Sequence, residues 1–358
     1  MKHEFDTVII GGGVVGNSIA YHLSEKQQDG ILVIDQNYPL SGTSGSTQAW
    51  VWIHTKCPSW YGEFSMYSAE LYPYLERKIG DVEYHRTGGL APFFTEQEKE
   101  EAKWLQDTQA EVGIDIQLLN RDEVLAIEPA FSPDVLGATF SRVDGNVNPL
   151  RLVEMYMKAA KKNGVSYEYF NRVVQLEKRN GSYIITSEKG SFTAKNLILS
   201  TGPWSQEVGK MLGIEIPVRP VRGQVLITEP VAPILNHTIN MIRQTNNGEI
   251  LIGYSMEEAS FDRRSTLDII QETAAKAVQY VPALAKANIV RCFSGLRAMP
   301  IDELPIIGKV PNMDNLYVAV MHSGVTLSPL VGTLMTELLV EGETSIPIDR
   351  YSITRFDH

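Results

Sequence analysis

Cysteine is scarce in this 358-residue chain, which contains only Cys57 and Cys292. Their spacing matches neither a metal-binding nor a redox motif, so we expect a reducing compartment and no disulfide. Long apolar runs are also missing, because no stretch approaches the roughly 18 residues that a membrane span needs. The apolar sequence of a first strand begins within a few residues of Met1, so no signal peptide is expected. These absences predict a cytoplasmic protein without a membrane span.

Basic residues are outnumbered, with 32 Lys and Arg against 43 Asp and Glu and a net charge of -11. No run of Lys and Arg makes a local exception, so nucleic acid is not an expected partner. The sequence also lacks internal repeats, low-complexity segments and any spacing typical of metal ligands, so no metal site is predicted. With 43% hydrophobic and 21% charged residues, a chain of this length is expected to form a globular protein of two domains.

A glycine-rich turn is the most informative feature that is present. Residues 5–16 read Phe-Asp-Thr-Val-Ile-Ile-Gly-Gly-Gly-Val-Val-Gly, a pattern typical of a strand, a tight turn and the start of a helix. Gly11, Gly13 and Gly16 complete G-x-G-x-x-G, in which the glycines make the turn, admit a pyrophosphate and let helix and strand pack closely. A second strand ends in Asp35, about twenty residues further on, where a carboxylate accepts hydrogen bonds from an adenosine ribose. The turn therefore predicts a dinucleotide at a helix N-terminus.

Two neighbouring features each allow two interpretations. The polar loop 41–47 is typical of a flexible linker, but after the second strand of a dinucleotide fold its hydroxyl and N–H groups would line the path of the phosphates and a flavin ring. His54 lies in a segment that also contains Trp50, Trp52 and Trp60. A lone histidine among aromatics is more often structural than catalytic, and we keep His54 as a weak candidate for a substrate contact.

Periodicity and chain breakers predict a mixed α/β protein, α+β overall, in which two regions alternate along the chain. Helices are expected at 58–79, 96–111, 121–127, 150–163 and 266–280, and strands at 84–90, 165–170, 173–177, 183–186, 196–200, 239–243 and 249–254. Residues 1–80, 143–216 and 295–358 would form a discontinuous Rossmann-type nucleotide-binding domain. Residues 81–142 and 217–294 would form a substrate-binding domain with a mainly antiparallel β-sheet.

Further motifs follow in the second half of the chain. They are Ser200-Thr-Gly-Pro-Trp-Ser205, Arg219-Pro-Val-Arg-Gly-Gln224, Gly295-Leu-Arg297, Leu304-Pro-Ile-Ile-Gly308 and His322-Ser-Gly-Val-Thr-Leu-Ser-Pro329. The last is again a strand that passes through a glycine turn into a helix, which would set a second helix N-terminus against the same cofactor. With the first glycine turn, this ordered set resembles the D-amino-acid oxidase family of FAD-dependent oxidoreductases, in its glycine oxidase and sarcosine oxidase-like branch. The resemblance covers the chain end to end.

The resemblance implies that FAD lies extended in the first domain, with its reactive ring facing a cavity roofed by the second. It places the adenosine diphosphate part on the first glycine turn and Asp35, the flavin along the loop at Ser44, and the adenine beside Val174. The cofactor-binding residues that it implies are Gly11, Gly13, Val14, Val15, Gly16, Asp35, Gln36, Thr43, Ser44, Ser46, Thr47, Val174, Thr201, Gly202, Trp204, Gly295, Arg297, His322, Ser323, Gly324, Val325 and Thr326. Some sarcosine oxidases attach flavin to a cysteine in the C-terminal region, but the matching position here is nearer Gly295 than Cys292. Non-covalent FAD is therefore expected.

The resemblance also assigns Arg297 to the substrate carboxylate. The chemistry fits, because a planar guanidinium forms two parallel charge-assisted hydrogen bonds to a carboxylate. A structural ion pair is the alternative role for this arginine. Arg243 is a weaker second candidate, and Arg222 is expected to be structural. Several glycine oxidases have a tyrosine where this chain has Met241, which argues against a tyrosine contact to the substrate here.

The expected function is FAD-dependent oxidation of the C–N bond of a small amino acid or N-substituted amine that carries a carboxylate, of the glycine, sarcosine or D-amino-acid type. Hydride transfer to flavin N5 would give an imine that water hydrolyses, so no obligatory general base is sought. Two alternatives stay open: an FAD-dependent 2-hydroxy-acid dehydrogenase, and a flavin subunit of a hetero-oligomeric amine dehydrogenase. The expected partners are the small-molecule substrate and oxygen or another electron acceptor, and a homo-oligomer is left open.

Overall fold

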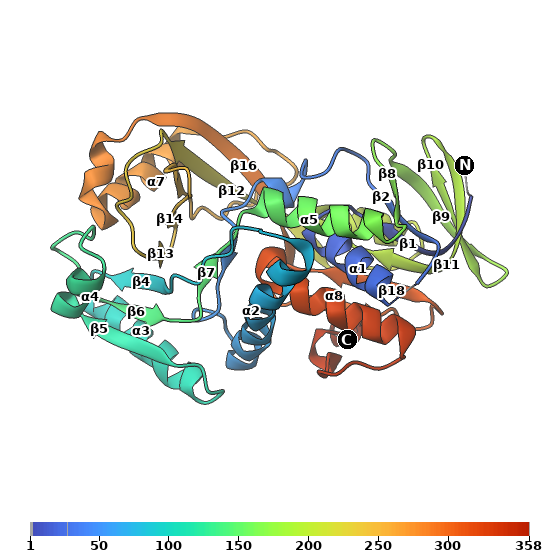
Figure 1. The fold of residues 1–358 in the computed structure, drawn as a ribbon, viewed down its shortest axis with the longest axis horizontal. Helices are drawn as coiled ribbons and strands as arrows, with labels where there is room; N and C mark the ends of the chain where they lie inside the picture. The colour runs from blue at the N-terminus through green and yellow to red at the C-terminus, as the bar shows by residue number, and fades with distance from the viewer. Residues whose placement is uncertain (1–2, 27, 358) are drawn as a thin grey trace.

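The computed structural model describes residues 3–26 and 28–357. Two eight-stranded β-sheets organise these residues, one in each half of the elongated molecule (Figure 1). The first sheet has a parallel centre and the second is mainly antiparallel. The fold class predicted from the sequence, a mixed α/β protein with a Rossmann-type domain and an antiparallel partner sheet, is thereby confirmed.

Parallel strands form the centre of the first sheet, in the order β18–β11–β1–β2–β8. An antiparallel edge strand, β17, pairs with β18, and the β9–β10 hairpin extends from β11. Apolar cores cover both faces of this sheet, which is why nearly all residues of its central strands are buried. The strands are β1 (Glu4–Ile10), β2 (Ile31–Ile34), β8 (Ser166–Glu168), β9 (Val173–Arg179), β10 (Ser182–Ser187), β11 (Gly190–Leu199), β17 (Ile306–Lys309) and β18 (Leu316–Val320).

Four helices pack against one another on one side of the first sheet, α1 (Val14–Glu25), α2 (Ser59–Ile79), α5 (Pro149–Lys162) and α8 (Gly324–Val340). Of these, α1, α5 and α8 lie over the sheet, and α2 packs against α5 and α8 beside it (Figure 1). The opposite face packs against the β9–β10 hairpin and the short helix α6 (Ser205–Lys210). Strands β1 and β18 each lead through a short turn into a helix, so the N-termini of α1 and α8 both lie at the carboxyl end of the sheet.

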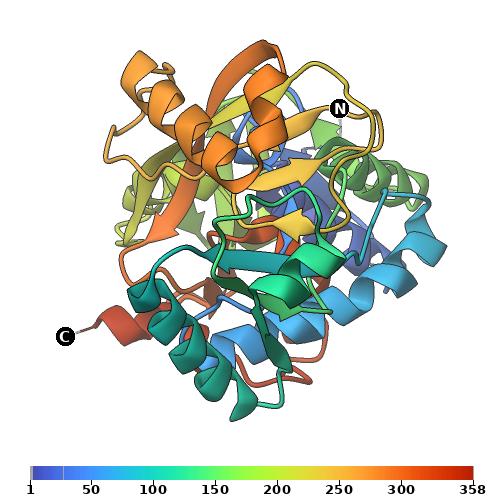
Figure 2. The same cartoon turned by 90° about the vertical axis from the view of Figure 1, so that its left-hand side faces the viewer.

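The second sheet has the order β16–β12–β15–β14–β13–β4–β6–β5. Its longest strands, β12 and β16, pair antiparallel along almost their whole length. Helices α3 (Glu96–Ala110), α4 (Arg121–Ile127) and α7 (Leu267–Tyr280) pack against this sheet and are in front in Figure 2. The strands are β4 (Gly89–Phe93), β5 (Ile116–Asn120), β6 (Gly137–Ser141), β12 (Val218–Thr228), β13 (Thr238–Ile239), β14 (Ile242–Gln244), β15 (Ile250–Ile252) and β16 (Ile289–Pro300).

Shorter elements complete the fold. A two-stranded ribbon pairs β3 (Trp50–Val51) with β7 (Gly145–Asn146). Single turns of 3₁₀ helix span Thr43–Gly45, Gly202–Trp204, Pro282–Lys286, Asp349–Tyr351 and Ile353–Phe356. The first two of these turns lie at the carboxyl end of the first sheet and contribute to the cavity described below.

The structure departs from the sequence-based elements at three places. The strand predicted at 84–90 lies at β4 instead, because the residues before it make only an isolated bridge at His85. The strand predicted at 239–243 is split into β13 and β14, because Met241 has a left-handed backbone with φ of 75°. The predicted domain boundary at 295 falls inside β16, so the chain passes between the two regions as one continuous strand. The division into domains otherwise stays a prediction.

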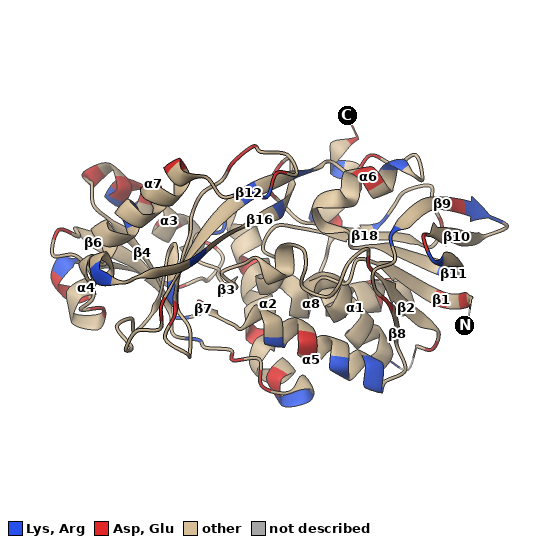
Figure 3. Ribbon diagram, turned by 90° about the horizontal axis from the view of Figure 1, so that it is seen from above, with Lys and Arg blue, Asp and Glu red and all other residues tan. Residues whose placement is uncertain are grey.

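Basic and acidic residues are interspersed along the ribbon in both halves of the molecule (Figure 3). No helix in the described ranges is long and apolar enough to cross a lipid bilayer. The residues that the structure places also bring no three His, Cys, Asp or Glu side chains together as a metal-binding group. The two cysteines are exposed free thiols.

Candidate functional site

A cavity of about 650 Å³ lies where the two halves of the molecule meet. Its walls come from the carboxyl ends of β1, β2, β11 and β18 on one side and from β12 and β16 on the other. Open α/β sheets bind ligands at this end of their strands. All the cofactor-binding residues predicted from the sequence line the cavity, except Gly16 and Val174. The cavity is therefore the candidate functional site.

The glycine turn after β1 has the geometry that its sequence predicts. Gly11 has φ of 110°, and a Cβ there would lie 2.1 Å from the carbonyl oxygen of Ser200 on the neighbouring strand. A Cβ on Gly16 would lie 1.9 Å from the carbonyl oxygen of Gly11. Gly16 thus lets α1 pack against the turn and does not face the cavity. Gly13 does face it, and its nearest neighbour would be the hydroxyl of Ser44 at 3.2 Å.

The N-terminus of α1 is open toward the cavity. Its N-cap residue, Gly13, offers no capping side chain, and the first turn contains no acidic residue. The N–H of Val14 donates to Ser44 Oγ at 2.9 Å, which ties the polar loop to the helix. Asp35 accepts from the N–H of Gly12 at 2.7 Å, and burial raises the pKa of this carboxyl. Small residues and open N–H groups at a helix N-terminus suit the pyrophosphate of a dinucleotide.

The N-terminus of α8 is a second open helix end at the same cavity. Its N-cap residue, Ser323, has φ of 42°, its side chain does not cap the helix, and the first turn again has no acidic residue. Thr326 Oγ1 donates to the carbonyl of Trp50 at 3.0 Å and accepts from the N–H of Trp52 at 3.2 Å, which fixes the helix against the β3 segment. The positive end of the α8 dipole therefore faces the cavity. Electron-rich groups of a ligand are favoured there.

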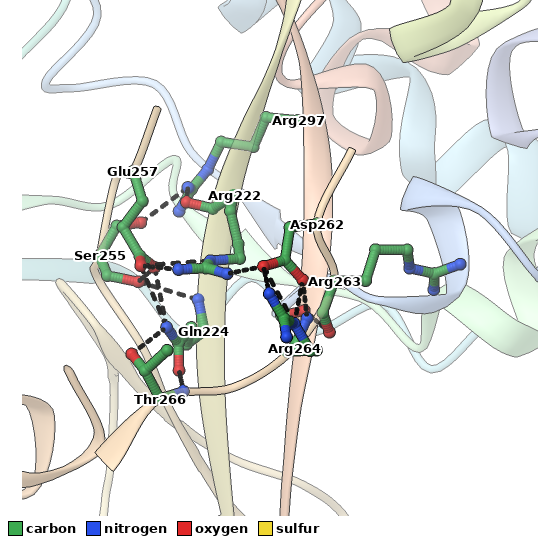
Figure 4. Close-up of polar contacts among 10 residues, drawn as sticks. Arg222, Gln224, Ser255, Glu257, Asp262, Arg263, Arg264, Thr266 and Arg297 are labelled. Atoms are coloured by element: carbon green, nitrogen blue, oxygen red, sulfur yellow. Dashed lines mark hydrogen bonds and ion pairs between the residues drawn. The ribbon is translucent and has the colours of Figure 1, made fainter. Parts of the chain in front are cut away.

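Arg297, on β16, lines the cavity without an ion-pair partner among the described residues. Its Nη1 donates to the carbonyl oxygens of Ser255 at 2.7 Å and of Arg222 at 3.4 Å (Figure 4). A Cβ on Gly223 would lie 2.4 Å from this Nη1, so the guanidinium lies directly over a glycine of β12. Burial lowers the pKa of Arg297, and the charge of Glu257 opposes that effect. A structural ion pair, the alternative role for this arginine, is not what the structure shows.

A polar network behind Arg297 holds the segment after β15 against β12 (Figure 4). Arg222 donates to Glu257 at 2.6 Å and lies 3.4 Å from Asp262. Gln224 Nε2 donates to both carboxylate oxygens of Glu257, at 3.0 and 3.1 Å, and its N–H donates to Ser255 Oγ at 2.8 Å. Arg222 is therefore structural, as the sequence predicts. The network positions the carbonyl of Ser255, which accepts the hydrogen bond from Arg297 Nη1.

His54 and Arg243 do not line the cavity, and their assignment as weak substrate contacts is corrected. His54 is fully buried, with Nδ1 bonded to the carboxylate of Asp144 and Nε2 3.1 Å from Thr139 Oγ1. Arg243 Nη1 donates to the carbonyl of Val147 at 2.7 Å, and burial lowers the pKa of this arginine to about 10. Both side chains join the β3 and β7 region to the second sheet.

Val174, which the resemblance places beside the adenine, does not line the cavity, and the adenine contact stays a prediction. Val173 lines the cavity, whereas Val174 is 48% exposed and does not. Successive residues of a strand such as β9 face opposite sides, so a shift of one position moves the side chain to the other face. Cys292 is exposed and also lies outside the cavity lining, and non-covalent attachment of the cofactor stays a prediction.

Lys56 is a cavity residue that sequence reasoning missed. Its partly buried side chain lines the cavity, and Nζ donates to Ser323 Oγ at the N-terminus of α8. Burial lowers the pKa of Lys56 to about 8, against the opposing effect of Asp144. His322 is beside it, and burial together with the charges of Lys56 and Arg297 holds the pKa of this imidazole well below its usual range. A lysine that meets its partner 267 residues away along the chain leaves no local signal in the sequence.

Comparison with known proteins agrees with this geometry. A family profile described as FAD dependent oxidoreductase (DAO) matches residues 6–338. The chain is 31% identical to hydrogen cyanide synthase subunit HcnC of Pseudomonas protegens, over 98% of this chain and 95% of that protein. It is 27% identical to an opine oxidase subunit of Rhizobium meliloti, over 99% of this chain and 98% of that protein. The solved structure of glycine oxidase from Geobacillus kaustophilus matches with a TM-score of 0.95 and 25% identity and covers 99% of both chains.

Proposed function

This chain belongs to the DAO family of FAD-dependent oxidoreductases, and from that premise we propose that it oxidises the C–N bond of a small amine or amino acid that carries a carboxylate. The observation that supports the substrate class is Arg297, a cation that lines the cavity without an acidic partner in the described part of the chain. Bound FAD supplies the oxidising chemistry, because it accepts a hydride from the carbon that bears the amine. The imine product would then be hydrolysed by water to a 2-oxo acid or aldehyde, with release of ammonia or an amine.

The cofactor would be held by the parts of the cavity whose chemistry suits it. The glycine turn, the open N-terminus of α1 and Asp35 would hold the adenosine diphosphate part. The loop at Ser44 and the open N-terminus of α8 would hold the flavin part. The fit is supported by the absence of acidic side chains from the first turns of both helices and by the narrow space around Gly11 and Gly13.

Arg297 would orient the substrate. Its Nη1 is occupied by two backbone carbonyls, whereas Nε and Nη2 have no hydrogen-bond acceptor among the residues that the structure describes. These two N–H groups form one edge of the guanidinium, and such an edge binds a carboxylate through two parallel hydrogen bonds. Holding the carboxylate in one orientation fixes the direction of the C–H bond that reacts.

The charges around the cavity favour the reactive form of the amine. Lys56 and Arg297 are cations, and His322 stays neutral because its pKa is held well below the usual range. The acidic residues of the lining are Glu207, which is exposed, and Asp35, which accepts from the N–H of Gly12 in the glycine turn. Nearby positive charge disfavours a protonated ammonium group on the substrate. The unprotonated amine, which is the form that gives up a hydride from its carbon, would therefore be favoured on binding.

The experiment for this proposal is anaerobic titration of the purified yellow holoenzyme with a panel of amines, amino acids and 2-hydroxy acids. Bleaching of the flavin by carboxylated amines supports the proposal. Bleaching by hydroxy acids alone would overturn it. Arg297→Met should raise KM for a carboxylated substrate roughly 100-fold, because hydrogen bonds to charged groups contribute about 1.5 to 3 kcal/mol each. Arg291→Met, an exposed change on the same strand, is the matched control and should have no effect.

A flavin subunit of a hetero-oligomer is the second candidate. Two relatives that match the chain over almost its full length are named as subunits, one of hydrogen cyanide synthase and the other of opine oxidase. This candidate predicts that the isolated chain binds FAD but is not bleached by any member of the panel. Bleaching of the isolated chain by an amine would argue against a requirement for a partner.

A further inference from the structure

We propose that the cavity binds substrates with two anionic groups, one at Arg297 and the other at Lys56, so that the substrate is an amine with two carboxylates. The inference rests on the proposed function and refines its substrate class. Arg297 comes from β16 of the second sheet, and Lys56 comes from the segment between β3 and α2 on the side of the first sheet. Two separate parts of the fold therefore each supply one cation to the same cavity.

The ammonium group of Lys56 has unused donors. An ammonium has three N–H groups, and the one hydrogen bond of Nζ within the described residues is to Ser323 Oγ. No carboxylate oxygen in that part of the chain lies within ion-pair distance of Nζ. Asp144, whose charge acts on Lys56, is already engaged by His54 and by the N–H of Ile53 at 2.7 Å. The remaining face of Nζ is packed 5.3 Å from the ring centroid of Tyr61.

Lys56, Arg297 and His322 all line the cavity, and Lys56 Nζ is bonded to Ser323, the residue next to His322. The charges of both cations also lower the pKa of His322. Two partly buried cations without carboxylate partners repel each other and are costly to remove from water. One substrate carboxylate, bound by the free edge of Arg297, would leave Lys56 unpaired. A second carboxylate on the same molecule would neutralise both cations.

Ser323 and the dipole of α8 also favour an anion at Lys56. Ser323, the acceptor for Lys56, is also the N-cap of α8, whose side chain does not cap the helix. A carboxylate at Lys56 would thus lie beside the flavin at the N-terminus of α8, where the helix dipole favours negative charge. The other possible partner of Lys56 is the cofactor itself, and the experiment below separates the two.

The test uses two ethers that resemble the substrates but cannot be oxidised as amines, oxydiacetate with two carboxylates and methoxyacetate with one. Binding to the FAD holoenzyme is measured from the perturbation of the flavin spectrum. Wild-type protein should bind oxydiacetate about tenfold or more tightly than methoxyacetate, because a charged hydrogen bond contributes that much. Lys56→Met should remove the preference for oxydiacetate and leave the Kd of methoxyacetate unchanged. Lys56→Arg should retain the preference for oxydiacetate.

Lys158→Met, which removes a surface lysine paired with Glu154, is the control for a change of net charge and should behave as wild type. The proposal is overturned if Lys56→Met leaves the preference intact, or if it weakens both ligands equally and changes the flavin reduction potential, which would assign Lys56 to the cofactor. Bleaching by sarcosine and iminodiacetate separates this result from the proposed function. Equal bleaching by both with no ether preference would overturn the second site alone. A preference for oxydiacetate in a protein that no carboxylated amine bleaches would overturn the proposed function and leave the second anion site.

Discussion

The Nη1 group of Arg297 donates a hydrogen bond of 2.7 Å to the carbonyl oxygen of Ser255. Ser255 is held in turn through its hydroxyl, which accepts from the N–H of Gln224 at 2.8 Å. The guanidinium is therefore anchored from one end by backbone that a polar network fixes in place. The anchor leaves the other edge of the guanidinium available, and a preoriented cation loses less freedom when it binds an anion.

Gly223→Ala should weaken substrate binding without changing the fold. An added Cβ would lie 2.4 Å from Nη1 and 2.7 Å from Cζ of Arg297, so the guanidinium must move. We expect KM for a carboxylated substrate to rise about tenfold, since misplacement of a positioning group is costly. Steady-state kinetics and the thermal unfolding midpoint check this. A normal KM in a variant with a normal midpoint would show that Arg297 does not position the substrate.

Glu257→Gln should lower the stability of the protein. The side chain of its partner Arg222 is only 9% exposed, and a buried charge that loses the closer of its two carboxylate partners, with Asp262 left at 3.4 Å, costs about 2 kcal/mol. Glu258→Gln is the matched control, because Glu258 forms an exposed pair with Arg219, and exposed pairs contribute about 0 to 1 kcal/mol. Urea denaturation of both variants gives the comparison. Equal losses of unfolding free energy in the two variants would mean that Glu257 contributes no more to stability than an exposed ion pair does.

Gly16→Ala and Gly12→Ala should differ sharply in their effect on the stability of the protein. A Cβ on Gly16 would lie 1.9 Å from a backbone oxygen, whereas a Cβ on Gly12 would have its nearest neighbour at 3.5 Å. Overpacking of this kind costs about 1 to 3 kcal/mol or more. The thermal unfolding midpoint of the FAD-free proteins should fall for Gly16→Ala and change little for Gly12→Ala. The reverse order would contradict the close packing of α1 on the turn.

The preference for oxydiacetate should decrease above about pH 8. Lys56 has a pKa of about 8 in the free protein, so it is protonated and able to bind an anion below that pH and loses its charge above it. The groups that face it do not titrate in this window: the pKa of His322 is held well below its usual range, and burial raises the pKa of Tyr61 to about 12. Burial also raises the pKa of the neighbouring Cys57 thiol.

Binding titrations between pH 6.5 and 9.5 (roughly 1.5 units either side of the Lys56 pKa) test this. The Kd of oxydiacetate should rise through the upper half of the range, while the Kd of methoxyacetate stays constant. Lys56→Met should give two flat profiles. A constant ratio of the two Kd values in wild-type protein would mean that a group other than Lys56 sets the preference.

Local sequence patterns predict the parts of the site that are formed by adjacent residues. Gly11 and Gly16 are identifiable because the turn and its close packing follow from their spacing. Arg297 is identifiable from its motif. By contrast, His54 and Arg243 are placed away from the cavity by tertiary burial that no local pattern encodes.

Two further features of the cavity have the same origin. Val173 lines the cavity and Val174 does not, and the face of a strand that points into a cavity is not determined by its residue types alone. Lys56 was missed because its role depends on a contact with Ser323, 267 residues away. Long-range contacts of this kind, between the β3–α2 segment and α8, are visible only once the chain is folded.

The most direct test of the account is a single anaerobic turnover of the purified holoenzyme with an amine substrate. We expect bleaching of the flavin accompanied by one carbonyl product and one released ammonia or amine for each FAD reduced, and we expect Arg297→Met to slow the bleaching roughly 100-fold at a substrate concentration below the wild-type KM. Flavin that stays oxidised in the presence of every carboxylated amine, in a protein that retains its FAD, would contradict the account.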